Sequence, residues 1–330
     1  MMINLASIVR CPRCKSNILE SQPPSRQSEA AERRIYCSNA RCDYASRGFT
    51  FADGRPVLID FDASIFDADA YSYGGSKSVL PRDDTGTGIR TILRRAIIGR
   101  NYKAREFCSE MLRILKRNSD RPKLLIVGGG AIGEGTNEFY ADPELDLVSI
   151  DVYSSQNVTI VADAHQLPFA DSVFDGLWIQ SVLEHVLNPE IVVQEIHRVL
   201  NQNGLVFADA PFMWPVHEGA YDFTRFSLNG FRWLFRNFEL ISAGVGSGAG
   251  TATLLSIRYL IRSLTGSNVF STLASAPFFW LRYLDRYTQS RPNADAASGI
   301  YFFGARSAQS IPTKSMITFY EKQAIHRDIT

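Results

Sequence analysis

Short apolar runs alternate with helical segments through the middle of the chain, between residues 123 and 211. A helix that begins at Pro189 carries Val192, Ile196 and Val199 on one apolar stripe, as a helix with one buried face requires. The apolar runs read KLLIVGG, LDLVSIDVY, VTIVADA, VFDGLWIQS and GLVFADAP. Continuous apolar strands that alternate with helices are typical of a parallel sheet with helices on both faces. The pattern therefore predicts an α/β fold.

Two further strands are predicted in FELISAGVG and GIYFFGARS, and they are expected to close the sheet as an antiparallel hairpin. An insertion of about residues 250–295 separates them, and its segments TLLSIRYLIRSL and SAPFFWLRYLDRY predict two unusually apolar and aromatic helices. These helices either cap the core, which is the simpler interpretation, or form an interfacial surface that meets a lipid-linked substrate. Residues 307–330 are expected to form a loosely held tail.

Residues 62–123 connect the N-terminal part of the chain to this domain. Residues 62–89 are rich in Asp, Ser, Gly and Tyr and predict a mobile connection. Residues 90–123 predict a basic helix, which either meets an anionic partner or is the solvated side of a helix that packs on the core. The packed helix is favoured, and its apolar face consists of Ile92, Leu93, Ile97, Phe107, Met111, Leu112 and Leu115.

Length and charge narrow the function classes. The 330 residues suffice for one large α/β domain and a small accessory module. The 35 basic and 34 acidic side chains argue against a nucleic-acid coat and against an acidic tail. No apolar run approaches the roughly 18 residues of a membrane span, because Arg258, Arg262 and Arg282 interrupt the nearest candidates. The N-terminus lacks the pattern of a signal peptide, so we expect a cytoplasmic protein.

Four of the five cysteines form two short pairs near the N-terminus, Cys11 with Cys14 and Cys37 with Cys42. Four thiolates satisfy a tetrahedral Zn²⁺ and leave no open coordination position, so the predicted metal is structural. Two disulfides or free thiols are the alternative, which is disfavoured in a chain without an export signal. The following FADGRPVLIDF resembles zinc-ribbon proteins associated with methyltransferases. We therefore predict a zinc ribbon over residues 1–61, while Cys108 is predicted to be an ordinary core residue.

A glycine-rich turn follows the first strand of the predicted sheet. Gly128, Gly130 and Gly133 fit the dinucleotide fingerprint G-x-G-x-x-G, and they also fit the S-adenosylmethionine (SAM) loop of class I methyltransferases. Asp151 ends the second strand, where a carboxylate can accept hydrogen bonds from ribose hydroxyls. Both cofactors contain a ribose, so these residues alone leave the choice open.

The third strand and the segment after it favour SAM. VADAHQLPFADSVFDGLWIQSVLEHVLNPE, residues 161–190, resembles the class I SAM-dependent methyltransferases of the small-molecule type, and the resemblance covers about residues 120–245 and 299–306. It implies a Rossmann-like seven-stranded methyltransferase sheet over residues 124–306, with the zinc ribbon before it and the helical insertion before its last strand. A NAD-dependent oxidoreductase is disfavoured, because the third-strand pattern of Asp163 and Ala164 has no role there.

The resemblance also implies the cofactor contacts. Asp163 is expected to bind the adenine amino group and the Ala164 amide a ring nitrogen. The turn of Gly128, Gly129 and Gly130 is expected to face the methionine part and the ribose of the cofactor. Asp151 and Val152 are expected to contact the ribose. The reactive side of the cofactor is expected to lie against Gln180 and Ser181. The chain departs from the family at Ile126, where an acidic residue is frequent, and Glu134 is expected to compensate.

The acceptor is expected to lie over the end of the fifth strand. APFMWPVHEGAYDFTRFSLNGFRWLF, residues 210–235, resembles a stretch of family members from cell-surface glycan assembly. By this resemblance His217 is the candidate base, and Asp222 and Arg225 orient the acceptor. An Asp–Arg pair that only locks a loop is the alternative. His185 is either a histidine packed under a loop or a functional residue, and the sequence does not decide between these two interpretations.

These features together predict a SAM-dependent methyltransferase that acts on a hydroxyl of a glycan, of a lipid-linked acceptor or of another small molecule. The alternatives are an RNA methyltransferase, a NAD-dependent oxidoreductase and a non-catalytic SAM-binding protein. The expected cofactors are SAM and structural Zn²⁺. The expected location is the cytoplasm, with peripheral contact at the inner membrane face if the acceptor is lipid-linked.

Overall fold

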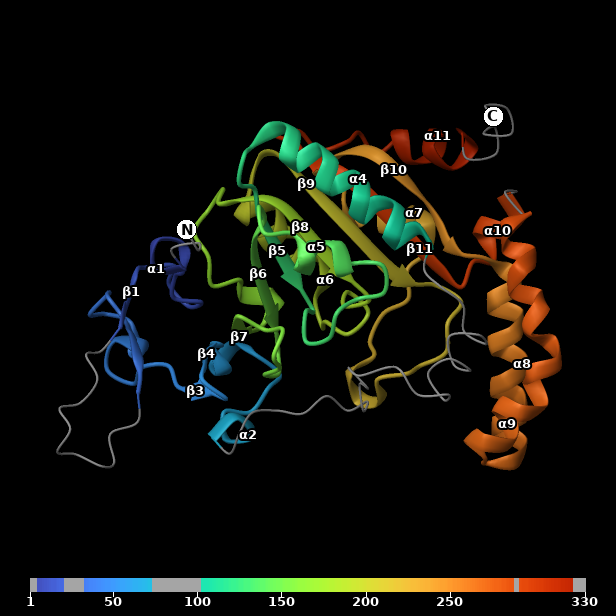
Figure 1. Cartoon of the computed structure of the whole chain (residues 1–330), viewed down its shortest axis with the longest axis horizontal. Helices are drawn as coiled ribbons and strands as arrows, with labels where there is room; N and C mark the ends of the chain where they lie inside the picture. The colour runs from blue at the N-terminus through green and yellow to red at the C-terminus, as the bar shows by residue number, and fades with distance from the viewer. Residues whose placement is uncertain (1–4, 21–32, 73–101, 288–290, 323–330) are drawn as a thin grey trace.

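A nine-stranded sheet forms the centre of the computed structural model, which describes residues 5–20, 33–72, 102–287 and 291–322 (Figure 1). Its strand order is β10-β11-β9-β8-β5-β6-β7-β4-β3. The strand β11 runs antiparallel to both of its neighbours, and β4 through β9 pair in parallel. The seven strands of the main domain are β5 (Lys123–Val127), β6 (Asp146–Asp151), β7 (Ile160–Ala162), β8 (Phe174–Gln180), β9 (Leu200–Pro211), β10 (Phe238–Ser247) and β11 (Gly299–Arg306). The predicted Rossmann-like seven-stranded sheet is confirmed.

The other two strands come from the N-terminal module, which the sequence analysis had ended at residue 61 as a unit of its own. The strands β3 (Phe51–Ala52) and β4 (Arg55–Leu58) form a hairpin across Asp53 and Gly54, which both have positive φ as a tight hairpin turn requires. Val57 and Leu58 pair in parallel with β7 and cover its edge. An edge strand has unpaired backbone groups, and the hairpin satisfies them.

Helices cover both faces of the sheet, and successive side chains of each strand point to opposite faces. Leu124 and Ile126 of β5 face α4 (Tyr102–Asn118) and α5 (Asn137–Ala141). Leu125 and Val127 face the opposite cluster, which includes α6 (Pro189–Val199) and α7 (Leu228–Leu234). The two apolar clusters position the carboxyl ends of β5 to β9 along one edge of the sheet, where ligands bind in α/β folds.

The basic helix α4 packs as an amphipathic helix. Its apolar side buries Phe107, Met111, Leu112 and Leu115 against the sheet. On its outer side Arg113 pairs with Glu110, and Lys116 pairs with acidic residues of the segment after α5. The predicted apolar positions Ile92, Leu93 and Ile97 lie outside the described residues, as does most of the predicted connection.

The N-terminal module contains α1 (Leu5–Ile8), the hairpin of β1 (Ile18–Glu20) and β2 (Ile35–Cys37), and η1 (Asp43–Ala45). It docks on the main domain. The Arg10 amide donates to the Pro168 carbonyl at 2.9 Å, and Lys15 Nζ lies 2.9 Å from a Glu195 carboxylate oxygen. Cys11 and Tyr44 belong to the same apolar cluster as the main domain's core. The module and the main domain therefore share one core.

The insertion lies at the end of the molecule opposite the N-terminal module (Figure 1). It consists of α8 (Ala249–Thr265), α9 (Asn268–Ser275), η5 (Ala276–Arg286) and α10 (Arg291–Asp295). The Asp285 carboxylate accepts hydrogen bonds from the amides of Gly248 and Gly250, at 3.0 and 2.8 Å, and joins the two long segments. Within the described ranges, no helix is long and apolar enough to cross a membrane.

Part of the expected tail forms a helix. The helix α11 (Ser315–Lys322) packs Phe319 against the main apolar cluster, and its Tyr320 hydroxyl donates to the Asp295 carboxylate. These contacts hold residues 315–322 more firmly than the sequence analysis expected.

Candidate cofactor and acceptor site

The glycine turn after β5 is packed tightly against β6 and the segment after it. Gly128 has a φ of +83°, and the amides of Gly128 and Gly129 both donate to the Ile150 carbonyl, at 2.9 and 3.0 Å. A Cβ on Gly129 or Gly130 would lie 1.9 Å from the Ser149 hydroxyl or 2.2 Å from the Tyr153 hydroxyl. A larger residue at either position would have to displace the Ser149 or Tyr153 side chain, so glycine fits this tight packing.

The carboxylate of Asp151 lies beside this turn. Its Oδ2 accepts a hydrogen bond from the Gly130 amide at 2.8 Å, and its Oδ1 accepts one from the Val152 amide at 2.7 Å. The predicted ribose ligand and the predicted turn are thus brought together at the carboxyl ends of β5 and β6. A carboxylate held by two amides is fixed in orientation.

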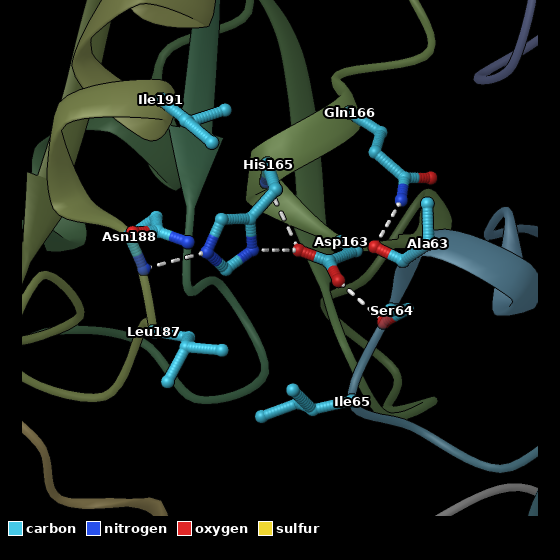
Figure 2. A pocket seen from close by; sticks show the side chains of 9 residues that line it. All are labelled: Ala63, Ser64, Ile65, Asp163, His165, Gln166, Leu187, Asn188 and Ile191. Atoms are coloured by element: carbon cyan, nitrogen blue, oxygen red, sulfur yellow. Dashed lines mark hydrogen bonds and ion pairs between the residues drawn. The ribbon is translucent and has the colours of Figure 1, made fainter.

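A cavity of ≈ 370 Å³ opens beside Asp163, at the carboxyl end of β7 (Figure 2). Asp163 is buried, and η3 (Ala164–Gln166) follows it. Its Oδ1 accepts a hydrogen bond from the His165 amide at 2.9 Å and lies 2.6 Å from His165 Nδ1, and its Oδ2 accepts from the Ser64 hydroxyl at 2.5 Å. Burial alone would raise the pKa of Asp163, but His165 and Ser64 lower it below its usual value. The carboxylate is therefore ionised and suited to accept from an amino group.

Two apolar side chains border this cavity from opposite directions. Figure 2 shows Ile65 and Leu187 pointing into the space beneath Asp163 and His165. Both side chains remain partly exposed, at 40% and 49%. The His165 ring is fixed between Asp163 and the Asn188 amide, which donates to Nε2 at 3.1 Å. The cavity thus combines apolar side chains with a buried hydrogen-bond acceptor, as small-molecule sites commonly do.

Residues 60–72, which we call the strap, run from the N-terminal module across this edge of the sheet. The strap contains η2 (Phe61–Ala63) and α2 (Asp69–Ser72). Ser64 bonds Asp163, and the Tyr71 hydroxyl donates to the Val152 carbonyl at 2.6 Å. Phe66 stacks on Tyr221 with ring centroids 5.8 Å apart. The strap therefore contacts the predicted adenine site, the predicted ribose site and the loop after β9.

The strap is tied to the first cysteine pair. Arg13, between Cys11 and Cys14, donates from Nε and Nη2 to the two carboxylate oxygens of Asp60, each at 2.8 Å. It also pairs with Asp43 and Asp62. Two parallel hydrogen bonds between a guanidinium and a carboxylate fix the relative orientation of the two groups as well as their distance.

The end of β8 completes the cofactor side. Ser181 has a φ of +52°, an unusual value for a residue other than glycine, and its amide donates to Asp209 Oδ1 at 2.8 Å. Gln180 Nε2 donates to the Glu134 carbonyl at 3.5 Å, so the strand end contacts the glycine turn. The Glu134 side chain is exposed, and Ile126 is buried in the face that contacts α4.

The predicted acceptor residues gather in the loop after β9, around η4 (Gly219–Tyr221). His217 Nδ1 lies 3.3 Å from Asp222 Oδ2, and the Arg225 guanidinium forms a fork on the same carboxylate, with Nη2 2.9 Å from Oδ2. Burial would raise the pKa of Asp222, but the hydrogen bond from Arg225 holds it at about 2. The three residues form one hydrogen-bonded unit. Their role toward an acceptor stays a prediction, with an Asp–Arg pair that only locks the loop as the alternative.

A buried acid that the sequence analysis did not select lies next to this unit. Glu184, in the turn after β8, is fully buried, and its Oε1 lies 3.5 Å from His185 Nε2 and 3.8 Å from His217 Nε2. Burial raises the pKa of Glu184 to about 8, and the charge of Asp209 acts in the same direction. The run Leu-Glu-His at a strand end gave no distinctive pattern, so this acid is recognised only through its burial.

The four N-terminal cysteines gather at one point. Their sulfur atoms all lie within 4.8 Å of one another, with Cys11 Sγ 3.8 Å from Cys42 Sγ and Cys14 Sγ 3.4 Å from Cys37 Sγ. A tetrahedron with Zn–S bonds of about 2.3 Å has edges of about 3.8 Å. The residues therefore fit a Zn²⁺ ion in size and in chemistry.

Comparisons with known proteins agree with this geometry. A family model described as a methyltransferase domain matches residues 85–208. None of the curated proteins matches the chain in sequence.

The comparison with solved structures found a proposed sarcosine dimethylglycine methyltransferase from Galdieria sulphuraria. The identity is 15%, the TM-score is 0.42, and 62% of this chain and 86% of that chain are covered. Phosphoethanolamine N-methyltransferase 2 from Haemonchus contortus is similar in two structures. In the complex with S-adenosylhomocysteine the identity is 20%, the TM-score 0.40, and the covered shares 68% and 58%. In the complex with SAM the values are 18%, 0.41, 66% and 56%.

The matched residues contain β5 to β8, the glycine turn, Asp151 and Asp163, which are the parts that the SAM interpretation requires. Residues 85–208 are therefore similar to a methyltransferase domain.

Proposed function

We propose that this protein transfers a methyl group from SAM to a hydroxyl of a glycan, of a lipid-linked acceptor or of a related small molecule. The observation that carries the proposal is the group of Glu184, His185 and His217 at the carboxyl ends of β8 and β9. Ser181, one turn away, belongs to the predicted reactive side of the cofactor. A hydroxyl must lose its proton as it accepts a methyl group, and this group of side chains can take that proton.

SAM supplies an electrophilic methyl group, and most of the protein's work is to position the acceptor against it. The glycine turn and Asp151 are suited to the ribose and methionine end, and Asp163 to the adenine. In the acceptor loop, His217 Nδ1 faces the carboxylate of Asp222, which Arg225 keeps ionised. This contact fixes the orientation of the ring, and its Nε2 lies 3.8 Å from Glu184 Oε1, which could share a proton taken from the acceptor.

A lipid-linked acceptor is supported by the insertion. The Tyr259 hydroxyl of α8 donates to the Val216 carbonyl at 3.2 Å, next to His217. The insertion exposes many large apolar side chains, among them Leu260, Leu264, Val269, Phe270, Leu273, Phe279, Trp280 and Tyr287. Arg258, Arg262 and Arg282 lie on the same helices. Aromatic residues mixed with arginine are typical of surfaces that lie at a membrane interface.

We also propose that Cys11, Cys14, Cys37 and Cys42 hold a structural Zn²⁺ ion. The short distances between the four sulfur atoms support a zinc site. A structural role is supported because four thiolates fill all the ligand positions of a tetrahedral ion. For RNA as the acceptor, the outer side of α4 offers little support, because Arg113 and Lys116 are paired with acids.

The test is the His217→Ala variant, assayed by formation of S-adenosylhomocysteine with undecaprenyl-linked and free glycans as acceptors. We expect turnover to fall by about 10²–10⁴, the usual contribution of proton transfer by a side chain, while SAM affinity stays near wild type. His197→Ala, which changes a histidine on α6 whose Nε2 contacts the Ser307 carbonyl, is the matched control. Full turnover of His217→Ala would remove this loop from the reaction.

A further inference from the structure

Glu184 presents an unsatisfied carboxylate in the interior of the protein. Its side chain is fully buried, and neither carboxylate oxygen has a hydrogen-bond partner within the part of the chain that the structure describes. Its backbone is well held, because the amides of Phe223 and Thr224 donate to the Glu184 carbonyl at 2.8 and 3.2 Å. A buried polar group without a partner is costly, so its retention calls for a ligand.

The atoms that face this carboxylate are imidazole nitrogens. His185 Nε2 and His217 Nε2 lie 3.5 and 3.8 Å from the same oxygen, Oε1, and the three ligand atoms lie within 4.8 Å of one another. The two rings meet edge to face, with centroids 4.9 Å apart. They come from different parts of the chain, the turn after β8 and the loop after β9.

The partners of Nδ1 in each ring determine whether Nε2 carries a proton or a lone pair. His185 Nδ1 lies 2.7 Å from the Tyr221 carbonyl, which can only accept, so Nδ1 carries the proton. His217 Nδ1 is 3.3 Å from the Asp222 carboxylate and 3.3 Å from the Pro215 carbonyl, which are also acceptors. In the neutral rings the Nε2 lone pairs therefore point toward Glu184. Glu184 Oε1 and these two nitrogens therefore face one another as acceptors, and a shared proton or a cation can stabilise this arrangement.

The spacing suits a metal ion. Nitrogen or oxygen ligands at about 2.1 Å from an ion lie about 3.0–3.4 Å apart in octahedral or tetrahedral geometry. The distances of 3.5 and 3.8 Å need only small rotations of the rings to reach this range. The carbonyl behind His185 and the carboxylate behind His217 are the outer contacts that fix imidazole ligands in metal sites.

We propose that Glu184, His185 and His217 form a binding site for one divalent transition-metal ion, such as Co²⁺, Mn²⁺ or Zn²⁺. Two histidines and one carboxylate on one side of an ion leave positions for an external oxygen ligand. An ion there lowers the pKa of a hydroxyl bound beside it and replaces His217 as the activating group. The proposal of a metal site depends only on the positions of Glu184, His185 and His217. Its role in activating an acceptor hydroxyl rests on the proposed function.

The experiment counts metal ions in the full-length protein with Co²⁺ as the probe. The purified chain is stripped with chelator, dialysed against Co²⁺ and analysed for metal content and absorption. Cobalt in the four-cysteine site gives a thiolate charge-transfer band, whereas cobalt bound by nitrogen and oxygen gives only weak bands in the visible. We expect two ions in the wild type, of which one lacks the thiolate band.

Glu184→Gln and His217→Ala are expected to bind one ion each and to keep the thiolate band, and Cys37→Ser is expected to lose that band and keep the other ion. His197→Ala is the control that should retain two. If Glu184→Gln does not fold, His217→Ala decides, because its side chain lies in a partly exposed loop. A wild type that binds only the thiolate-bound ion, or variants that still bind two, would overturn the proposal. The metal content can be measured without a methyl acceptor. An absent metal site and an absent methyl-transfer activity are therefore detected separately.

Discussion

The Asp151 carboxylate accepts hydrogen bonds from two backbone amides beside the glycine turn. Its position after the second strand predicted a ribose ligand, and the structure adds that it fixes the glycine turn through the Gly130 amide. The adenine role of Asp163 was implied by the resemblance of residues 161–190 to class I methyltransferases. The role of Asp151 was predicted from its place at the end of the second strand of a parallel sheet.

Replacing Asp151 with Ala should therefore weaken SAM binding about 10- to 100-fold, because a hydrogen bond to a charged group contributes about 1.5–3 kcal/mol. Calorimetric titration measures this change. Asp120→Ala, at an exposed aspartate after α4, is the control and should bind as the wild type does. Equal affinities in the two variants would remove Asp151 from the ribose site.

Other residues of the site could not be found from the sequence. Ser64 and Asp163 are 99 positions apart, and nothing in the letters around Ser64 indicates that its hydroxyl reaches this carboxylate. Glu184 is similar, since its chemistry comes from burial and from two histidines that the chain brings to one oxygen. Such contacts depend on tertiary packing and have no local pattern.

At the scale of elements, the strap couples the N-terminal module to the cofactor edge. The sequence predicted a ribbon and a flexible connection after it, because Asp, Ser and Gly dominate that stretch. It did not predict that β4 pairs with β7 and thereby directs the next residues over Asp163. Parallel pairing across about 100 residues leaves no trace in either strand alone.

This coupling makes a test possible at the Arg13 contact. Arg13→Gln removes the fork on Asp60 but keeps all four cysteines, so we expect the zinc to remain while the strap loosens. If the strap is then ordered about a tenth to a third of the time, the dissociation constant for SAM rises about 3- to 10-fold. Arg41→Gln, at an exposed arginine of the second cysteine pair, is the control. SAM affinity that is identical in both variants would mean that the strap is only a linker.

At the scale of the whole molecule, the fold was predictable and its extensions were not. The apolar runs gave seven strands and the two-sided helix cover, because each burial pattern is local. The insertion was recognised as helical, but its surface was not predictable: η5 has no buried residue, whereas the simpler interpretation expected a cap that buries itself on the core.

The exposed apolar surface of the insertion should bind membranes. Wild-type protein is expected to sediment with vesicles of anionic phospholipid. The double variant Phe279→Ser, Trp280→Ser is expected to bind about 100-fold or more weakly, since burying each aromatic side chain contributes about 1.5–3 kcal/mol. Leu19→Ser, which removes an exposed apolar residue of the N-terminal module, is the control. Vesicle binding that the double variant retains would speak against this surface.

The most direct test of the account is a calorimetric titration of the wild-type protein with SAM, S-adenosylhomocysteine and NAD. The glycine turn alone fits either cofactor class, whereas Asp163 and the cavity beside it are expected to serve the adenine of SAM. We predict saturable one-to-one binding of SAM and S-adenosylhomocysteine and no binding of NAD at the same concentrations. Binding of NAD without binding of SAM or S-adenosylhomocysteine would contradict the account.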